Sequence, residues 1–216
     1  MTCTKALIAG LALVMACAAC SDSPAEPPDP AASGSPPAAA FTATVTPGKD
    51  SLAISYRLTN QTSIDLVALN SVPVANQHPP DAVYVTGRGD DGEVEISKRA
   101  FARPDSDMMR WESYPSIGGV IVAPGQSVAE DITVPLPLTR MFPYGNDLGD
   151  GEVKLPDPIK DVVFCLGVIP RSALPTPSPS PSGPTTDDSR IETVHSSFFT
   201  RAQHLFCSAP VKLRAG

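Results

Sequence analysis

Residues 41–59 read FTATVTPGKDSLAISYRLT, and this stretch decides the fold class. Apolar and polar side chains alternate through 41–46 and again through 52–59, and the turn-forming segment Pro47-Gly48-Lys49-Asp50 separates the two runs. Successive side chains of a strand point to opposite faces, so each run predicts a strand with one buried and one solvated face. Together the two runs predict a hairpin of half-buried strands.

Further strand-forming runs follow along the chain, separated by turn signals. Residues 83–88 and 93–98 flank Gly89-Asp90-Asp91-Gly92, which is typical of a hairpin turn. Residues 161–169 are nearly all apolar, as expected of a central strand that is covered on both faces. The remaining predicted strands are 64–69, 120–122, 128–134 and 206–213. With about eight short strands and no amphipathic helix, the sequence predicts an all-β protein, an antiparallel β-sandwich.

Length and charge limit the classes of function. The chain has 216 residues, of which 42% are hydrophobic, enough to bury one core or at most two small ones. Its 16 Lys and Arg residues are outnumbered by 23 Asp and Glu residues, which gives a formal net charge of −7. Binding to a phosphate backbone needs clustered cations, so we expect no nucleic-acid partner.

The N-terminus has the pattern of a signal peptide. One positive charge, Lys5, precedes 14 uninterrupted small or apolar residues at 6–19. Such a run is too short to cross a hydrocarbon core of about 30 Å as a helix, but it suits the apolar region of a signal peptide. Residues 1–19 are therefore predicted to address the chain for export.

The end of this run, Val14-Met15-Ala16-Cys17-Ala18-Ala19-Cys20, resembles the lipobox of bacterial lipoprotein precursors. In that family a cysteine follows small residues, with an aliphatic residue three positions upstream. Cys20 has the small residues but Cys17 at the aliphatic position, whereas Cys17 has Val14 correctly placed but the bulky Met15 before Ala16. The resemblance implies a lipid on Cys20, with Cys17 as the alternative, and a domain tethered to a bacterial membrane outside the cytoplasm. An ordinary secretory signal with incidental cysteines stays open as a third interpretation.

The remaining cysteines predict a disulfide. If Cys20 is lipidated and the cysteines before it leave with the signal peptide, Cys165 and Cys207 remain as an even pair in an oxidising compartment. A bond between them would close a loop that the chain-entropy model values at about 4 kcal/mol. The alternative is two buried free thiols.

Two segments predict disorder. Residues 21–40 hold six prolines, six alanines and four serines and no large apolar side chain, so they cannot bury enough surface to offset the entropy of ordering them. We expect residues 20–40 to be a lipidated cysteine with a spacer that lifts the sandwich domain, 41–216, off the bilayer. Residues 174–190 have the same character and are predicted to be a disordered insertion within that domain.

The search for chemistry finds no catalytic or metal motif. A Gly-x-Ser-x-Gly elbow, a His-Glu-x-x-His pair and a phosphate-binding glycine loop are all missing from the sequence. An acidic run at 146–152 departs from the calcium loop because Leu148 stands where a polar ligand is needed. His204 precedes Cys207 at a spacing that could suit zinc, but a disulfide is the preferred use of that thiol. Imidazole and thioether groups can bind copper, but no His and Met lie close together in sequence among His78, Met108, Met109, His195 and His204.

These observations predict a non-catalytic envelope lipoprotein, with no metal and no cofactor, that binds another envelope component. The strand pattern resembles immunoglobulin-like extracytoplasmic domains in style, although Trp111 lies outside the interval between Cys165 and Cys207. Two alternatives remain open. One is an envelope hydrolase whose site is assembled from distant loops, and the other is a periplasmic metal carrier.

The anchor is testable by substitution. Cys20→Ser should abolish metabolic labelling with a radioactive fatty acid and leave unprocessed precursor, because the thiol that accepts the lipid is gone. If the substituted protein is still labelled, Cys17 is the anchor.

Overall fold

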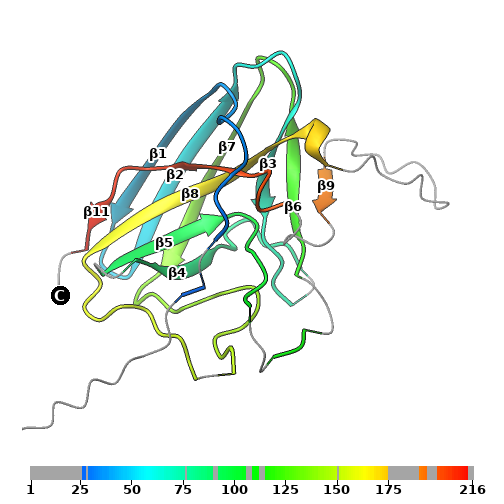
Figure 1. Ribbon diagram of the computed structural model, residues 1–216. Coiled ribbons are helices and arrows are strands. Elements are labelled where there is room, and N and C mark those ends of the chain that lie inside the picture. Colours follow the sequence, from blue (N-terminus) through cyan, green and yellow to red (C-terminus); the bar gives the residue numbers. More distant parts are fainter. Residues whose placement is uncertain are drawn as a thin grey trace, which may run out of the picture.

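The computed structural model describes residues 26–27, 29–75, 77–89, 92–105, 109–111, 115–149, 151–174, 190–193 and 199–213. Within these residues the chain forms strands and one short 3-10 helix, η1 (Arg171–Ala173), so the all-β prediction is confirmed. No helix in the described part of the chain is long and apolar enough to cross a membrane. The strands form two sheets that pack into a sandwich (Figure 1).

The small sheet contains the hairpin predicted from residues 41–59. Its order is β1 (Ala39–Pro47), β2 (Ser51–Asn60) and β7 (Ser127–Pro135), and both pairings are antiparallel. Alternate side chains of β2 are buried from Leu52 to Leu58 while those between them are exposed. The period-two pattern therefore gives one inner and one outer face, as predicted.

The large sheet has the order β4-β5-β8-β3-β6-β9, with β10 and β11 also paired to β8. Its strands are β3 (Leu66–Ser71), β4 (Tyr84–Arg88), β5 (Glu93–Lys98), β6 (Ile117–Val122), β8 (Asp161–Pro170), β9 (Arg190–Thr193), β10 (His204–Cys207) and β11 (Val211–Lys212). All pairings are antiparallel except that of β5 with β8, which is parallel. Parallel neighbours need a long connection, which β6 and β7 supply here.

Strand β8 organises the large sheet. Its residues Cys165 and Leu166 pair with both β5 and β10, and Val168 pairs with both β3 and β10. A strand has only two edges, so β10 occupies one edge while β5 and β3 follow one another along the other. Residues Val162 to Ile169 are all buried, which confirms the prediction of a central strand covered on both faces.

Each face of the large sheet carries its own apolar core. The first core lies between the two sheets, and its largest fully buried side chains are Leu52, Ile54, Leu58, Leu66, Ile96, Ile132, Phe164 and Leu166. The second lies on the opposite face of the large sheet, where loop residues cover it, and includes Val67, Leu69, Tyr84, Phe101, Ile117, Phe142, Tyr144, Leu148, Val153 and Ile169. Two cores on opposite faces explain why β8 is apolar throughout.

Two predicted boundaries differ from the structure. The last strand, expected at 206–213, is divided into β10 and β11, with Pro210 between them unable to donate a ladder hydrogen bond. The insertion expected at 174–190 is shorter, because Leu174 is buried in the second core and Arg190 begins β9. The rest of that insertion, 175–189, lies outside the described residues.

The N-terminal segment also differs from the expected spacer. Strand β1 begins at Ala39, and Glu26, Pro27 and residues 29–38, here called the strap, run along the domain (Figure 1). Within the strap, the Ser33 nitrogen donates to the Arg201 carbonyl at 2.7 Å. Proline-rich composition predicted disorder because it offers no apolar side chains, but the strap is held by polar contacts instead.

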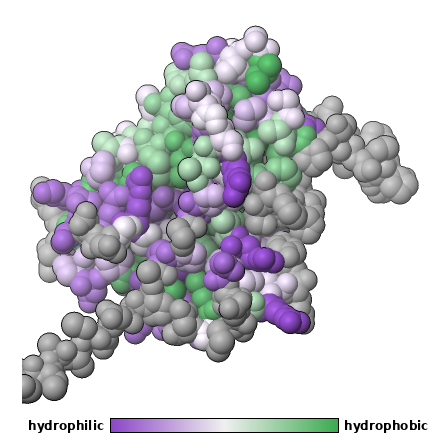
Figure 2. All heavy atoms as spheres, in the orientation of Figure 1, coloured by the Kyte–Doolittle hydropathy of each residue, from purple (hydrophilic) through white to green (hydrophobic). Residues whose placement is uncertain are grey.

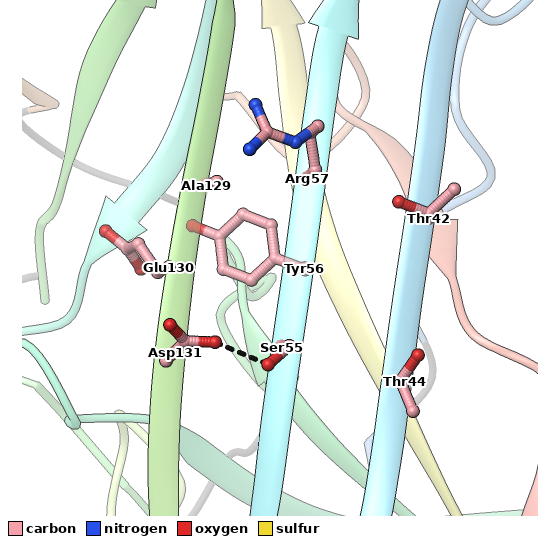
Figure 3. Close-up of a pocket in the computed structure, with 8 residues that line it drawn as sticks. All are labelled: Thr42, Thr44, Ser55, Tyr56, Arg57, Ala129, Glu130 and Asp131. Carbon is pink, nitrogen blue, oxygen red and sulfur yellow. Dashed lines mark hydrogen bonds between the residues drawn. The ribbon is translucent and has the colours of Figure 1, made fainter.

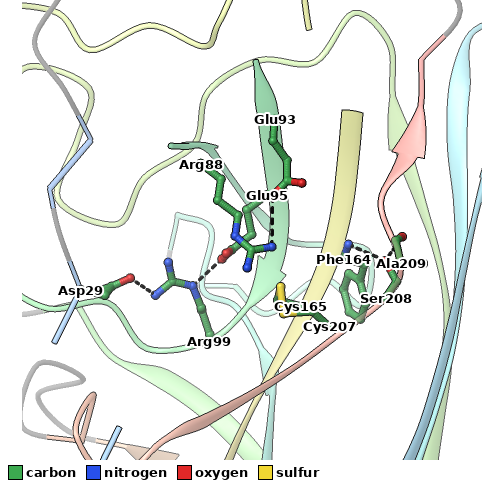
Figure 4. Close-up of a disulfide and its surroundings, with 10 residues drawn as sticks. All are labelled: Asp29, Arg88, Glu93, Glu95, Arg99, Phe164, Cys165, Cys207, Ser208 and Ala209. Carbon is green, nitrogen blue, oxygen red and sulfur yellow. Dashed lines mark hydrogen bonds and ion pairs between the residues drawn. A yellow bond between two sulfur atoms is a disulfide. The ribbon is translucent and has the colours of Figure 1, made fainter. Parts of the chain in front are cut away.

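The predicted disulfide joins Cys165 to Cys207 (Figure 4). The two residues lie directly opposite each other in the register of β8 and β10, with their Cα atoms 4.1 Å apart. Cys165 is fully buried. The bond therefore ties edge strand β10 to the centre of the large sheet.

Removal of this disulfide should destabilise the domain. The double substitution Cys165→Ser and Cys207→Ser is expected to lower the free energy of unfolding by about 4 kcal/mol, because the cross-link no longer restricts the unfolded chain. Denaturant titration measures the loss. Alkylation before and after reduction tests the bond itself, and two alkylated cysteines without reductant in exported protein would contradict it.

Candidate functional site

Among the residues that the structure describes, three cations are buried, and each contacts a carboxylate. Lys98, Arg99 and Arg140 have side-chain exposures of 0%, 6% and 4%. Isolated buried charges are strongly unfavourable, so each of these side chains depends on its partners. The three contacts organise the polar chemistry of the domain.

Lys98 is the last residue of β5, and its ammonium group is fully saturated with acceptors. Its Nζ donates to the main-chain oxygens of Asn70 at 3.1 Å and Pro80 at 2.7 Å, and to Glu130 Oε2 at 2.8 Å. An ammonium group has three donors, and all three have partners here.

The register of the large sheet explains why Lys98 and Asn70 meet. Lys98 pairs with Leu166 in the parallel ladder of β5 and β8. Antiparallel β3 pairs Ala68 with Val168, so two residues later Asn70 reaches the level of the same Leu166. The C-terminal ends of β5 and β3 therefore converge on one point of the β8 edge. The Lys98 ammonium supplies hydrogen-bond donors where the two strands stop.

Glu130 completes this cluster from the opposite sheet. It follows the inward alternation of Val128, Ile132 and Val134 on β7. One carboxylate oxygen accepts from Lys98, and the other accepts from Asn70 Nδ2 at 2.6 Å. The ion pair thus connects the two sheets across the first core.

Tyr56 lies beside this carboxylate. Its ring reaches from β2 toward Glu130 on β7 (Figure 3) and stacks on Phe164 of β8 with centroids 5.2 Å apart. Burial, and then the nearby negative charge of Glu130, raise the pKa of Tyr56 far above its ordinary value. The phenol therefore stays neutral at any physiological pH.

The outer surface of the small sheet is shallow and hydroxyl-rich. A hollow there is lined by Thr42, Thr44, Ser55 and Arg57 along with Asp131 (Figure 3). Ser55 Oγ donates to the Asp131 carboxylate across the β2–β7 pair.

The strap supplies the partner of Arg140. Glu26 takes a bidentate position, with Oε1 2.8 Å from Arg140 Nε and Oε2 2.6 Å from Arg140 Nη2. The Gly87 nitrogen also donates to Glu26 at 2.9 Å, and Arg140 Nη1 donates to Asn146 at 2.8 Å. Paired parallel hydrogen bonds are the strongest form of an arginine–carboxylate contact.

A second strap carboxylate binds Arg99. The Arg99 guanidinium lies 2.5 Å from Asp29 Oδ2 through Nη1 and 2.5 Å from Glu95 Oε1 through Nε (Figure 4). It also stacks 3.5 Å above the Phe101 ring. The strap therefore places two carboxylates, three residues apart, on two buried arginines.

The residues weighed for metal binding are dispersed. His78 bonds to Ser71 Oγ, and the sulfur of Cys207 is bonded to Cys165 and thus is not free to join His204 as a zinc ligand. Asn146 accepts from Arg140, and Asp147 accepts from its neighbour Gly149. Across the described residues, no group of three His, Cys, Asp or Glu side chains could hold a metal ion. Met108 and His195 lie outside those residues.

Sequence reasoning missed the buried ion pairs. Glu95 alternates with Val94 and Ile96 and so points to the other face of β5, yet it is buried at 4% exposure because the second core covers that face. A signal for the other cluster was present: Lys98 and Glu130 both occupy inward positions of an apolar alternation. The strap residues carried no such signal.

The chain was compared with family models, curated proteins and solved structures. No family model, curated protein or solved structure matches the chain. The site is therefore interpreted from its own geometry.

The contribution of the Glu26–Arg140 ion pair to stability can be compared with that of an exposed ion pair. Glu26→Ala should lower the free energy of unfolding by about 3 kcal/mol, because it leaves the Arg140 charge buried without a carboxylate. Glu93→Ala is the matched control, since its partner Arg88 is 46% exposed, and its effect should stay within about 1 kcal/mol. Denaturant titration measures both. Equal losses would show that the strap contact does not stabilise the fold.

Proposed function

We propose that this protein is a non-catalytic envelope lipoprotein, tethered to a bacterial membrane through Cys20, whose sandwich binds an extended strand of another envelope protein. The lipobox pattern at 14–20 supports the tether. The bond between Cys165 and Cys207 supports an oxidising compartment, because structural disulfides persist mainly in exported proteins.

The strap shortens the connection to the membrane. If Cys20 carries the lipid, only the five residues 21–25 separate it from Glu26, and the six Cα–Cα steps from Cys20 to Glu26 reach at most about 20 Å. The domain would then stay next to the bilayer, with the Arg140 contact as its fixed point. A partner would meet it in a restricted range of orientations.

The observation that carries the binding proposal is the edge of the small sheet. β1 has nine residues, none of them charged, and in the described part of the chain it pairs with β2 alone. Natural edge strands usually carry charges, prolines or bulges that prevent pairing with other chains. The only such feature of β1 is Pro47 at its end, so the strand is suited to accept another strand by main-chain hydrogen bonds.

An apolar seam lies next to this edge. Phe41 of β1 is only partly buried and contacts Phe206 of β10, with ring centroids 5.9 Å apart. Figure 2 shows hydrophobic residues gathered over the upper part of this face of the molecule. An added strand could cover these side chains while it pairs with β1.

A photo-crosslinking side chain tests this surface in cells. Placed at Ala40, an exposed residue of β1, it should give an adduct of defined mass with one envelope protein. The matched position is Val74, which is also exposed but lies outside β1, and no adduct is expected there. The substitution Ala43→Lys should abolish the Ala40 adduct, because it puts a charge on the inner side of the edge strand. Equal adducts at both positions would contradict the proposal.

A further inference from the structure

We propose that Lys98 and Asn70 become joined by a side-chain amide bond, which forms within the folded domain with Glu130 as the acid–base group. The bond would link the ends of β5 and β3 at the point where the ladder of the large sheet is interrupted. This inference does not depend on the lipid anchor or on the binding surface.

The geometry that points to this reaction is one carboxylate shared by two nitrogens. Glu130 Oε2 lies 2.8 Å from Lys98 Nζ, and Glu130 Oε1 lies 2.6 Å from Asn70 Nδ2. The first nitrogen must lose protons to form an amide, and the second must gain one to leave. A single carboxylate in contact with both can do both tasks, which is the arrangement that general acid–base catalysis requires.

The three side chains are also held together. The convergence of β5 and β3 on Leu166 brings Lys98 and Asn70 to one level of β8. Lys98 Nζ is further fixed 3.1 Å from the main-chain oxygen of Asn70 itself. Holding two reacting side chains close together converts a bimolecular condensation into a unimolecular step, which lowers the entropic part of its barrier.

The site is enclosed on the lysine side and open on the glutamate side. The Lys98 side chain is fully buried. The Glu130 side chain is 22% exposed, which leaves a way out for a small product.

The chemical step balances without an oxidant or a cofactor. Lys98 gives one proton to Glu130, and the Nζ lone pair attacks Cγ of the Asn70 amide, so that the Nζ–Cγ bond forms. Glu130 then protonates Nδ2, the Cγ–Nδ2 bond breaks and ammonia leaves. Glu130 takes the second proton from Nζ and passes it to the ammonia, which departs as ammonium. The products are one secondary amide and one ammonium ion.

Mass spectrometry of the full chain, after reduction, tests the proposal. The Lys98→Met variant cannot form the bond, so its mass, adjusted for the difference between Met and Lys, is the reference. The wild-type mass should be lower than this reference by one ammonia molecule. A protease digest should contain a branched peptide that joins Lys98 to Asn70. Glu130→Gln keeps the size of the side chain but cannot carry the proton, so its mass should show no loss.

Two further variants keep the test decisive if Glu130→Gln does not fold. Asn70→Asp should react with loss of water instead of ammonia. The mass of this variant should therefore be lower by one water molecule than its sequence predicts, and unfolding alone cannot cause that loss. Glu26→Gln alters a carboxylate on a different buried cation and should keep the ammonia loss. A wild-type chain of full mass overturns the proposal. So does an ammonia loss that survives in Lys98→Met, because Asn70 would then have cyclised onto the Ser71 nitrogen.

Discussion

The contact between the Lys98 ammonium and the Glu130 carboxylate is the constraint on which the sandwich depends. One partner belongs to the large sheet and the other to the small sheet, and the lysine is fully buried between them. Breaking a buried pair by removal of one partner typically costs 3–5 kcal/mol, because a charge then remains without compensation. This cost is comparable to a large share of the stability of a whole domain, so the two sheets are held in one relative register.

The same principle explains the arginines on the other face of the large sheet. Arg99 and Arg140 are buried by the loops of the second core. The strap supplies Glu26 to Arg140 and, beside Glu95 of β5, supplies Asp29 to Arg99. A proline-rich segment buries little apolar surface, yet these two carboxylates hold the strap against buried arginines. The segment that composition assigns to a spacer thus contributes to the fold through charge.

Covalent and polar ties converge on β8. The disulfide fixes β10 to one edge of this strand, while β5 and β3 share the other edge and end at Leu166 with Lys98 between them. Among the described residues the small sheet has no such tie along β1, whose inner side chains other than Val45 are only partly buried. The molecule therefore has a strongly held centre and one open, uncharged edge. This contrast is what gives the edge its suitability for a partner strand.

The sequence alone determined most of the strands, because a side-chain period of two is a local property that any alternating run displays, but β9 was not predicted. It also determined the hairpin at 41–59 and the central position of 161–169. It predicted the pairing of Cys165 with Cys207 only through the cysteines that remain if Cys20 is lipidated. Tertiary structure decided the parallel pairing of β5 with β8, the convergence of Lys98 and Asn70, and the contacts of Glu26 and Asp29. These features join residues that are distant in the chain, and their energy comes from the burial of charge. A charged residue in a sequence looks the same whether it will be solvated or buried, so only the packing of the other elements reveals its partner.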